Sequence, residues 1–387
     1  MTIATYNSKP SASSSLPHTP SGDDTCTHPR VIGEYCDGCG QHVGPDYGLD
    51  FGYLLKGLRL SPDEAARLSE METRRLSKHK KLVLVLDIDH TLVHSVASKY
   101  LNPEEKAFLL ENGGSLNDCL FTQQSMGLSV KLRPFARTFL KEVSAMFEMY
   151  LYTRGERRYS LHVAKLLDPE ATYFRDRVIS REDGPAGFKT LDMVLGHRNS
   201  VLIVDDTESV WPKDKENLIL IERYDYFAKK SSPTSHRYCE NGTDESELDG
   251  GLAKVLRVVK AVHEMYFESI TVSRRNVIFM LGLLRSSILE GCTLYYGNAD
   301  HKVNRVCLMA KEMGAKCSME RNSSTVTHLV SFEDDAEDIT WALQEKKFLV
   351  NPRWIAAAYC SWKRQPEEDF PIEKTLYNLF DGIEKCH

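Results

Sequence analysis

The chain has 387 residues, enough for two or three domains that each bury a core of their own. Its net charge of −6 and pI of about 6.1 argue against an overall basic field that would attract nucleic acid or a membrane surface. We expect neither a membrane span nor a signal peptide, because no apolar run is long enough and the N-terminus lacks an apolar core. Most of the ten cysteines are scattered singly, which is typical of reduced thiols in the cytosol or nucleus.

Residues 1–25 are rich in Ser, Pro and Thr, and we expect them to be disordered. A Cys/His-rich segment follows over residues 26–45, and its Cys-x-x-Cys spacing is that of a zinc knuckle. Five side chains compete for four ligand positions, so zinc and a metal-free loop are both open interpretations. The candidate zinc ligands are Cys26, His28, Cys36, Cys39 and His42.

Residues 46–78 are predicted to be a helical lead-in. The apolar pattern from about residue 58 to 78 indicates one helix, with Ser61 as its N-cap and Pro62 at its first position. The basic run over residues 74–81 is either a nuclear import signal or a solvated approach to the strand that follows.

Five consecutive aliphatic residues over 82–86 predict a strand covered on both faces, as in a parallel sheet between helices. Such sheets bind ligands beyond the carboxyl ends of their strands, which is where Asp87 and Asp89 follow. In an extended chain both carboxylates point to the same side and repel each other unless a cation or a proton separates them. Mg²⁺ is the natural partner, because it takes oxygen ligands and leaves positions for phosphate oxygens. The apolar strand before the pair disfavours a mere polar turn.

Alternating strand and helix patterns indicate a doubly wound, mostly parallel α/β domain over residues 79–268. Strands at 149–152 and 200–204 also end in polar side chains, namely Thr153 and the Asp205–Asp206 pair. The other elements expected are a short helix at 103–110 within an insertion at 97–128, a helix ending near 147, a helix at 156–168, strands at 178–181 and 218–221, a mobile acidic loop at 231–250 and an amphipathic helix from 252.

Residues 273–378 are predicted to form a second, smaller α/β unit, followed by a tail at 379–387. Its elements are a strand and turn at 289–297, a helix at 303–313 ended by Gly314, a strand at 327–331, a helix at 339–346, a strand at 348–350 and a last helix opened by residues 351–355. This order, with Trp354 as a core residue, resembles a BRCT domain.

Phosphopeptide-binding BRCT domains carry a small hydroxyl residue after the first strand and a lysine on the helix before the Trp segment. Tyr296 and Asp338 stand at these positions here. An acid in place of a lysine repels phosphate, so we expect this domain to bind protein through another surface, or phosphate only weakly.

The run from Asp87 to Ser95 resembles the signature of haloacid-dehalogenase-type phosphatases that act on the RNA polymerase II C-terminal domain. Further stretches and the Cys/His segment resemble the TFIIF-associating type of these enzymes, and the compact length resembles its plant members. These stretches are Tyr152–Arg157, Leu166–Pro169, Arg177–Arg181 and Asp205–Trp211.

The resemblance implies an aspartyl-phosphate mechanism, with Asp87 as nucleophile and Asp89 as general acid and then general base. It implies that Mg²⁺ is held by Asp87, the main-chain carbonyl of Asp89, and Asp205. It further implies phosphate contacts from Thr153 and Lys189, a role for Asp206 in orienting a metal-bound water or Lys189, and substrate contacts from Arg133 and Arg181.

The implied function is that of a nuclear protein serine phosphatase acting on the phosphorylated heptad repeats of RNA polymerase II and regulating transcription. TFIIF is an implied partner, and neither nucleic acid nor a membrane is expected to bind directly. One alternative is a non-catalytic recruiting protein, which replacement of Asp87, Asp89, Lys189 or Asp205 would have favoured. Another is a small-molecule phosphatase, for which the insertion at 97–128 looks too short to form a cap.

Overall fold

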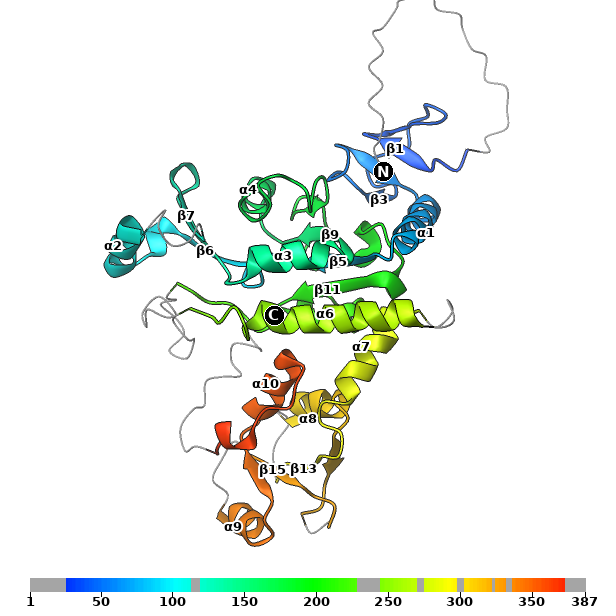
Figure 1. Ribbon diagram of the computed structural model, residues 1–387. Coiled ribbons are helices and arrows are strands. Elements are labelled where there is room, and N and C mark those ends of the chain that lie inside the picture. Colours follow the sequence, from blue (N-terminus) through cyan, green and yellow to red (C-terminus); the bar gives the residue numbers. More distant parts are fainter. Residues whose placement is uncertain are drawn as a thin grey trace, which may run out of the picture.

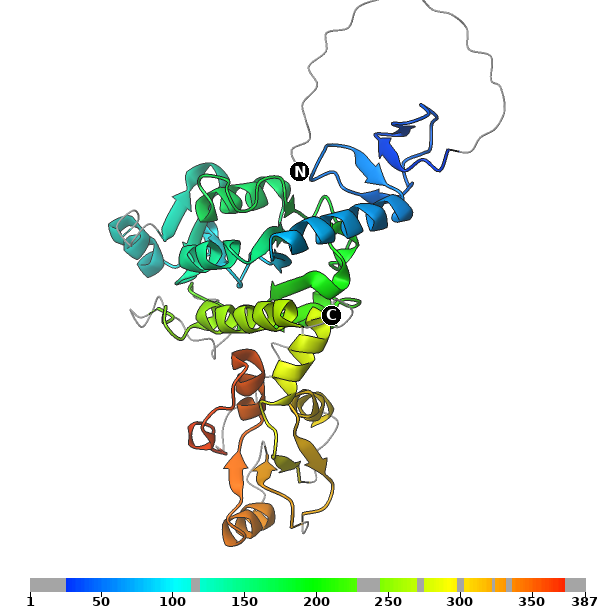
Figure 2. The ribbon, with the colours of Figure 1, turned by 45° about the vertical axis from the view of Figure 1, so that its right-hand side comes forward.

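The computed structural model describes residues 26–112, 119–227, 244–269, 275–297, 303–321, 324–331 and 336–372. The expected disordered N-terminus and the C-terminal tail lie outside these residues, as does most of the acidic loop. Within them, no helix has both the length and the apolar character of a membrane span. The described chain contains four sheets, shown in two views in Figures 1 and 2.

The central sheet has five strands in the order β10-β9-β5-β11-β12, and all its neighbouring strands are parallel. Its middle strand is the predicted one at 82–86, and every residue of that strand is buried. The strands of this sheet are β5 Leu82–Leu86, β9 Phe147–Tyr152, β10 Val178–Ile179, β11 Val201–Asp205 and β12 Leu218–Leu220.

Alternate side chains of β5 enter two different cores. Leu84 and its even-numbered neighbours pack with helices α3 and α6, whereas Val83 and Val85 pack with α1, Trp211 and the N-terminal segment. Full burial of such an aliphatic side chain contributes about 1.5–3 kcal/mol, so both layers stabilise the strand. The predicted doubly wound α/β fold is therefore confirmed. The helices are α1 Pro62–Lys78, α2 Pro103–Asn112, α3 Ala136–Ser144, α4 Arg157–Leu167, α6 Gly251–Glu268, α7 Val277–Ser286, α8 Val303–Glu312, α9 Ala336–Gln344 and α10 Arg353–Ser361.

The predicted N-cap of α1, Ser61, and the predicted first helical residue, Pro62, are both confirmed. Ser61 Oγ accepts a hydrogen bond from the Glu64 backbone N–H at 3.2 Å. Residues 58–60, expected to be helical, form strand β4, in which the burial of Leu60 anchors the sheet to the core. The apolar residues at 58 and 60 thus follow the period of two of a strand.

The lead-in predicted as helical is in part a small antiparallel sheet with the order β2-β1-β4-β3. Its strands have two or three residues each, too short to leave a periodic pattern in the sequence. Phe51 and Tyr53 attach it to the central domain, and the Tyr53 hydroxyl donates to the Met193 carbonyl at 2.7 Å. The strands are β1 Arg30–Ile32, β2 Tyr35–Cys36, β3 Leu49–Asp50 and β4 Leu58–Leu60.

The insertion after β5 contains the predicted helix, α2, and also an antiparallel sheet that was not predicted. This sheet has the order β6-β8-β7 and begins four residues after Asp89. It projects beyond the carboxyl end of β5, beside α2 (Figure 1). Its strands are β6 Val93–Ala97, β7 Leu120–Gln123 and β8 Leu128–Leu132.

Helix α7, which was not predicted, leads into the C-terminal α/β unit. There a parallel sheet with the order β14-β13-β15-β16 carries a core in which Trp354 is fully buried, as expected. Gly314 ends α8 with φ +89°, and a Cβ at this glycine would lie 1.9 Å from the Ser286 carbonyl oxygen. The strands are β13 Thr293–Tyr295, β14 Lys316–Ser318, β15 His328–Val330 and β16 Phe348–Val350.

Candidate active site

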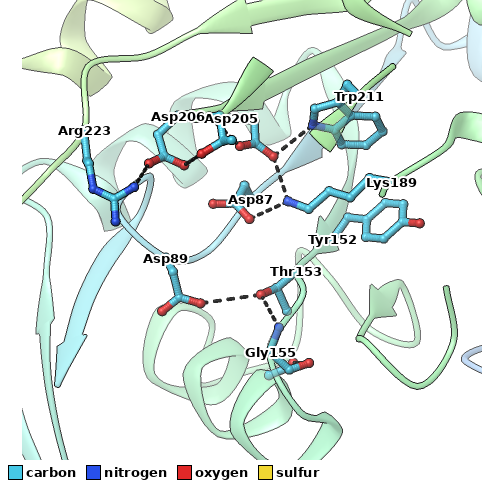
Figure 3. Close-up of polar contacts among 12 residues, drawn as sticks. Asp87, Asp89, Tyr152, Thr153, Gly155, Lys189, Asp205, Asp206, Trp211 and Arg223 are labelled. Carbon is cyan, nitrogen blue, oxygen red and sulfur yellow. Dashed lines mark hydrogen bonds and ion pairs between the residues drawn. The ribbon is translucent and has the colours of Figure 1, made fainter. Parts of the chain in front are cut away.

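The side chains predicted to carry the chemistry gather at the carboxyl ends of three adjacent strands. Asp87 follows β5, Thr153 follows β9, and Asp205 ends β11, as Figure 3 shows. All three are buried, with exposed fractions of 6%, 2% and 1%. Because parallel strands bring their carboxyl ends to one edge, residues far apart in the sequence meet here.

Lys189 links the acids of two strands. Its ammonium group donates to Asp87 Oδ1 at 2.5 Å and to Asp205 Oδ2 at 2.7 Å. Trp211 Nε1 donates to the same Asp205 oxygen at 2.9 Å, and the lysine lies over the rings of Tyr152 and Trp211. Burial alone would lower the pKa of Lys189, but the two carboxylates raise it above its ordinary value, so the lysine is held as a cation.

Beside this lysine, three carboxylates lie close enough together to bind one metal ion. One oxygen from each of Asp87, Asp205 and Asp206 lies within 4.8 Å of the others. Burial and the Asp205 charge raise the pKa values of both Asp87 and Asp206, although Lys189 and Arg223 oppose these shifts. One buried lysine does not balance so many acids, and oxygen donors suit a hard divalent cation, so the residues present fit Mg²⁺.

Arg223 holds Asp206 at the outer side of this cluster. Its Nη1 donates to Asp206 Oδ2 at 2.6 Å, and Thr207 Oγ1 donates to Asp206 Oδ1 at 3.0 Å. Asp206 thus faces Arg223 and makes no contact with Lys189 among the described hydrogen bonds, so its expected role in orienting the lysine lacks support. Sequence reasoning did not identify Arg223.

The side chain of the second acid, Asp89, lies away from Asp205 and Asp206, on the side of Thr153 (Figure 3). Its Oδ1 accepts hydrogen bonds from Ser95 Oγ at 2.8 Å and from Tyr159 Oη at 2.5 Å. Thr153 Oγ1 lies 3.5 Å from Asp89 Oδ2 and accepts from the Gly155 backbone N–H at 2.9 Å. Ser95 and Tyr159 were not assigned to the site from the sequence, because they come from β6 and α4.

The turn between Asp89 and β6 depends on His90. This residue has φ +63°, a conformation that non-glycine residues rarely adopt. Its backbone N–H donates to the Val93 carbonyl, and its ring nitrogen Nδ1 lies 2.9 Å from an Asp225 oxygen. These contacts fold the chain back immediately after the catalytic strand and keep Asp89 and Ser95 together.

An open pocket of about 300 Å³ adjoins Asp89. One wall comes from the insertion, through residues of β6, β8 and the turn between β7 and β8, and the other from the start of α4. Within the described residues the insertion therefore lies beside the site and does not cover it. The pocket is lined by Asp89, Ser95, Met126, Leu128, Glu156 and Tyr159.

Arg133 does not have the free guanidinium group that a substrate contact needs. It is 1% exposed, and its Nε and Nη2 donate to the two oxygens of Glu245 at 2.6 and 2.7 Å. Nη1 donates to the Thr91 carbonyl at 3.2 Å. The structure thus gives Arg133 a positioning role behind the Asp89 loop, and it fixes residue 245, which was expected to lie in a mobile loop.

Arg181 lies at the rim of the site, where its side chain is 59% exposed. It pairs with the exposed Glu156 at 3.0 Å. Because Glu156 also lines the pocket, Arg181 remains a candidate for contact with substrate.

Four of the five candidate zinc ligands lie together in the N-terminal segment: Cys26, His28, Cys36 and Cys39. His42 is not among them, because its Nε2 pairs with Glu34 at 2.8 Å. Of the five candidates for four ligand positions, His42 is thus the one that lies outside the group.

In the C-terminal unit, Asp338 is buried and pairs with Arg321 at 3.1 Å, and it lies 2.8 Å from the position of a Cβ on Gly297. Tyr296 is also buried. The chain segments that carry these two residues thus lie close together.

Comparisons with known proteins show the family of the chain. A family model described as NLI interacting factor-like phosphatase matches residues 82–261. The chain is 43% identical over 385 residues to RNA polymerase II C-terminal domain phosphatase-like 4 of Arabidopsis thaliana, covering 94% of this chain and 86% of that protein. It is 32% identical over 345 residues to phosphatase-like 3 of the same plant, covering 82% of this chain and 27% of that longer protein.

Among solved structures, that of Fcp1, an essential RNA polymerase II CTD phosphatase, matches with a TM-score of 0.64. It covers 79% of this chain and 100% of the solved chain at 24% identity, and at this identity the match shows the fold. The extent and identity of the first match show the family as well. The chain therefore belongs to the RNA polymerase II C-terminal domain phosphatase-like family, with an NLI interacting factor-like phosphatase domain over residues 82–261.

Proposed function

We propose that this chain is a Mg²⁺-dependent protein-serine/threonine phosphatase that dephosphorylates the heptad-repeat C-terminal domain of RNA polymerase II and so regulates transcription. One observation carries the proposal, namely the two sets of side chains that flank Asp87. Lys189 and Asp205 lie on one side of it, where a metal ion could bind. Asp89 and the Thr153 hydroxyl lie on the other. The relatives' names supply the substrate class.

In the first step, a carboxylate oxygen of Asp87 attacks the phosphorus of phosphoserine. A bond between phosphorus and Asp87 forms as the bond to the seryl oxygen breaks, giving an aspartyl-phosphate. Asp89, oriented by Ser95 and Tyr159, donates its proton to the leaving oxygen. Lys189 offsets negative charge beside the nucleophile, and the Thr153 hydroxyl donates to a phosphate oxygen.

In the second step, Asp89 accepts a proton from water as the water oxygen attacks phosphorus. The bond between phosphorus and Asp87 breaks, inorganic phosphate leaves, and both acids return to their initial states. Asp87 is regenerated as a carboxylate next to Lys189, which favours its charged form.

The acids fit a divalent cation, because their carboxylate oxygens are the ligands that a hard ion prefers. The carboxylates of Asp87 and Asp205 would hold Mg²⁺, and Asp206, which lies with them, would hold a water of the ion. The main-chain carbonyl of Asp89 is the further ligand that the sequence resemblance implies. When bound, the ion neutralises charge on the phosphoryl group and lowers the repulsion between Asp87 and Asp205.

The open pocket beside Asp89 supports an extended protein substrate. No cap covers the site among the residues that the structure describes, and such a site admits a peptide passing over it, with Arg181 and Glu156 at the rim. The nucleus is the compartment of this substrate, and TFIIF is the partner that the sequence resemblance implies.

The test is phosphate release from a phosphorylated heptad peptide by the full chain with Mg²⁺. Asp87→Asn is expected to lower turnover by at least roughly a thousandfold, while the exposed-site control Asp249→Asn leaves it unchanged. Peptides phosphorylated at different serines reveal the preferred position. Turnover that survives Asp87→Asn, or that needs no divalent ion, overturns the mechanism. Peptide binding without turnover in the unaltered chain supports a recruiting protein.

A further inference from the structure

Four side chains in the N-terminal segment converge at a distance from the phosphatase site. The ligand atoms of Cys26, His28, Cys36 and Cys39 all lie within 4.8 Å of one another. Cys26 Sγ lies 3.8 Å from Cys36 Sγ, and Cys39 Sγ lies 3.4 Å from His28 Nδ1. The two short distances therefore join all four side chains in two pairs.

These distances agree with the edges of a zinc tetrahedron. Zinc–sulfur bonds of about 2.3 Å and zinc–nitrogen bonds of about 2.0–2.1 Å, at tetrahedral angles, separate two sulfurs by about 3.8 Å and a sulfur from a nitrogen by about 3.5 Å. A disulfide would require about 2.05 Å between the sulfurs. Cys26 and Cys36 are thus spaced as ligands of one ion.

The local backbone supports the same arrangement. Gly40 turns the chain at φ +75°, and its N–H donates to the Cys36 carbonyl at 3.0 Å. His28 has φ +45°, a costly conformation that persists where its surroundings impose it.

The His28 side of the cluster is anchored as well. The Tyr47 hydroxyl donates to the Thr27 carbonyl at 2.9 Å, and the Tyr47 ring meets the His28 ring edge to face. The imidazole is thus placed by contacts that do not involve the cysteines, which makes its convergence with them an independent observation.

We propose that Cys26, His28, Cys36 and Cys39 bind one Zn²⁺ in a closed, structural site. Four protein ligands leave no open position for a substrate, and thiolate ligands select zinc over hard cations such as Mg²⁺. The small sheet needs such support, because strands of two or three residues bury little apolar surface of their own. The site stabilises the segment that Tyr53 ties to Met193, four residues after Lys189.

The first measurement is the metal content of the full chain, purified under reducing conditions without added metal. About one zinc per chain is expected. Replacement by Co²⁺ should give the absorption of a tetrahedral ion with sulfur ligands, and X-ray absorption should show three sulfurs and one nitrogen. Less than about a tenth of a zinc per chain with free thiols, iron in place of zinc, or an oxygen-rich shell overturns the proposal.

Variants identify the ligands. Cys36→Ser and His28→Ala are expected to lose most of the zinc, whereas His42→Ala, the matched control in the same segment, keeps it. Equal loss in His42→Ala contradicts the assignment. If Cys36→Ser does not fold, the X-ray absorption of the unaltered chain still decides. Zinc removal should lower Tm and leave Mg²⁺-dependent kcat within about twofold. The zinc proposal can therefore fail without the proposed phosphatase activity failing, and the two failures can be told apart.

Discussion

Lys189 Nζ lies 2.5 Å from a carboxylate oxygen of Asp87, a residue 102 positions earlier in the chain. The same nitrogen also contacts Asp205, and all three groups are almost completely buried. Two acids at the ends of adjacent strands therefore share one cation. Burial strengthens these interactions, and it makes the loss of any one partner costly.

We predict that Lys189→Met lowers both stability and turnover, and that Mg²⁺ restores part of the stability but not the turnover. Without the ammonium group, the buried Asp87 and Asp205 repel each other, which should cost roughly 3–5 kcal/mol of unfolding free energy in EDTA. Mg²⁺ should restore part of that stability, because it replaces the missing charge. Turnover should stay roughly 10²–10³-fold low, since the ion does not take the lysine's place beside the phosphate.

Urea unfolding with EDTA or Mg²⁺, together with phosphate release, tests this prediction. The exposed Lys213→Met serves as the matched control and should leave both quantities unchanged. Stability in EDTA equal to that of the unaltered chain would show that the acids are not both charged in the absence of the lysine.

We further predict that Tyr159→Phe affects leaving groups unequally. The hydroxyl donates to Asp89 at 2.5 Å, and the ring can keep its packing in the variant. General acid catalysis contributes roughly 10²–10⁴-fold, so partial loss of Asp89 orientation should lower kcat/KM for phosphoserine peptides by about tenfold. An aryl phosphate, whose leaving oxygen needs no proton, should lose less than about twofold.

Parallel assays of a phosphopeptide and an aryl phosphate provide the measurement, with the exposed Tyr100→Phe as the control. Equal losses on both substrates would mean that Tyr159 supports the fold of the site and not the position of the acid. A smaller loss in Tyr159→Phe than in Tyr100→Phe would contradict any role.

The parts of this site that sequence reasoning found are those with local signals. A buried parallel strand is a continuous apolar run, so β5 and the acids after it were recognisable from residues 82–89 alone. Lys189 has no such signal, and only the family resemblance pointed to it. Tyr159 and Ser95 reach Asp89 from different elements, and a contact between elements leaves no pattern in either one.

The same reasoning explains the errors in the fold. Strands β1 to β4 are too short for a measurable period, so the apolar residues before Ser61 were assigned to the helix. Arg133 matched the family pattern, but the pattern does not reveal Glu245, which occupies its guanidinium group. The residue type alone does not show whether an arginine is held in a buried ion pair or is free to contact substrate.

We predict that Glu245→Gln destabilises the phosphatase domain with little effect on substrate binding. The variant leaves the fully buried Arg133 without its bidentate partner, which should cost roughly 3–5 kcal/mol. KM should change by less than about twofold, because Arg133 then still donates to the Thr91 carbonyl and does not contact phosphate. Urea unfolding and steady-state kinetics measure both quantities.

Glu247→Gln, at an exposed position nearby, is the control for the Glu245–Arg133 ion pair. A large rise in KM at unchanged stability would restore the substrate-binding role for Arg133. A double-mutant cycle with Arg133→Met isolates the interaction, and it should show a coupling of at least about 1 kcal/mol.

A final prediction concerns the pH dependence of the C-terminal unit. His328 is 1% exposed and lies between the rings of Phe348 and Trp354. Burial lowers its pKa to about 4, although the Glu367 carboxylate, which accepts a hydrogen bond from the ring, opposes this shift. A depressed folded-state pKa means that protonation favours the unfolded chain. The contribution of His328 is therefore complete above about pH 6.5 and is lost as the pH falls to about 4, with a total of about 3 kcal/mol.

Urea unfolding followed by tryptophan fluorescence suits this test, because three of the four tryptophans lie in that unit. Between pH 7.5 and 5.0 the unaltered chain should lose about 2 kcal/mol more than His328→Asn, whereas the exposed His79→Asn should behave like the unaltered chain. NMR gives a second measure that needs no variant, since the ring proton of His328 should titrate near pH 4. A midpoint near 6.5 would contradict the prediction, because a ring held in an apolar sandwich cannot take a proton as readily as one in water.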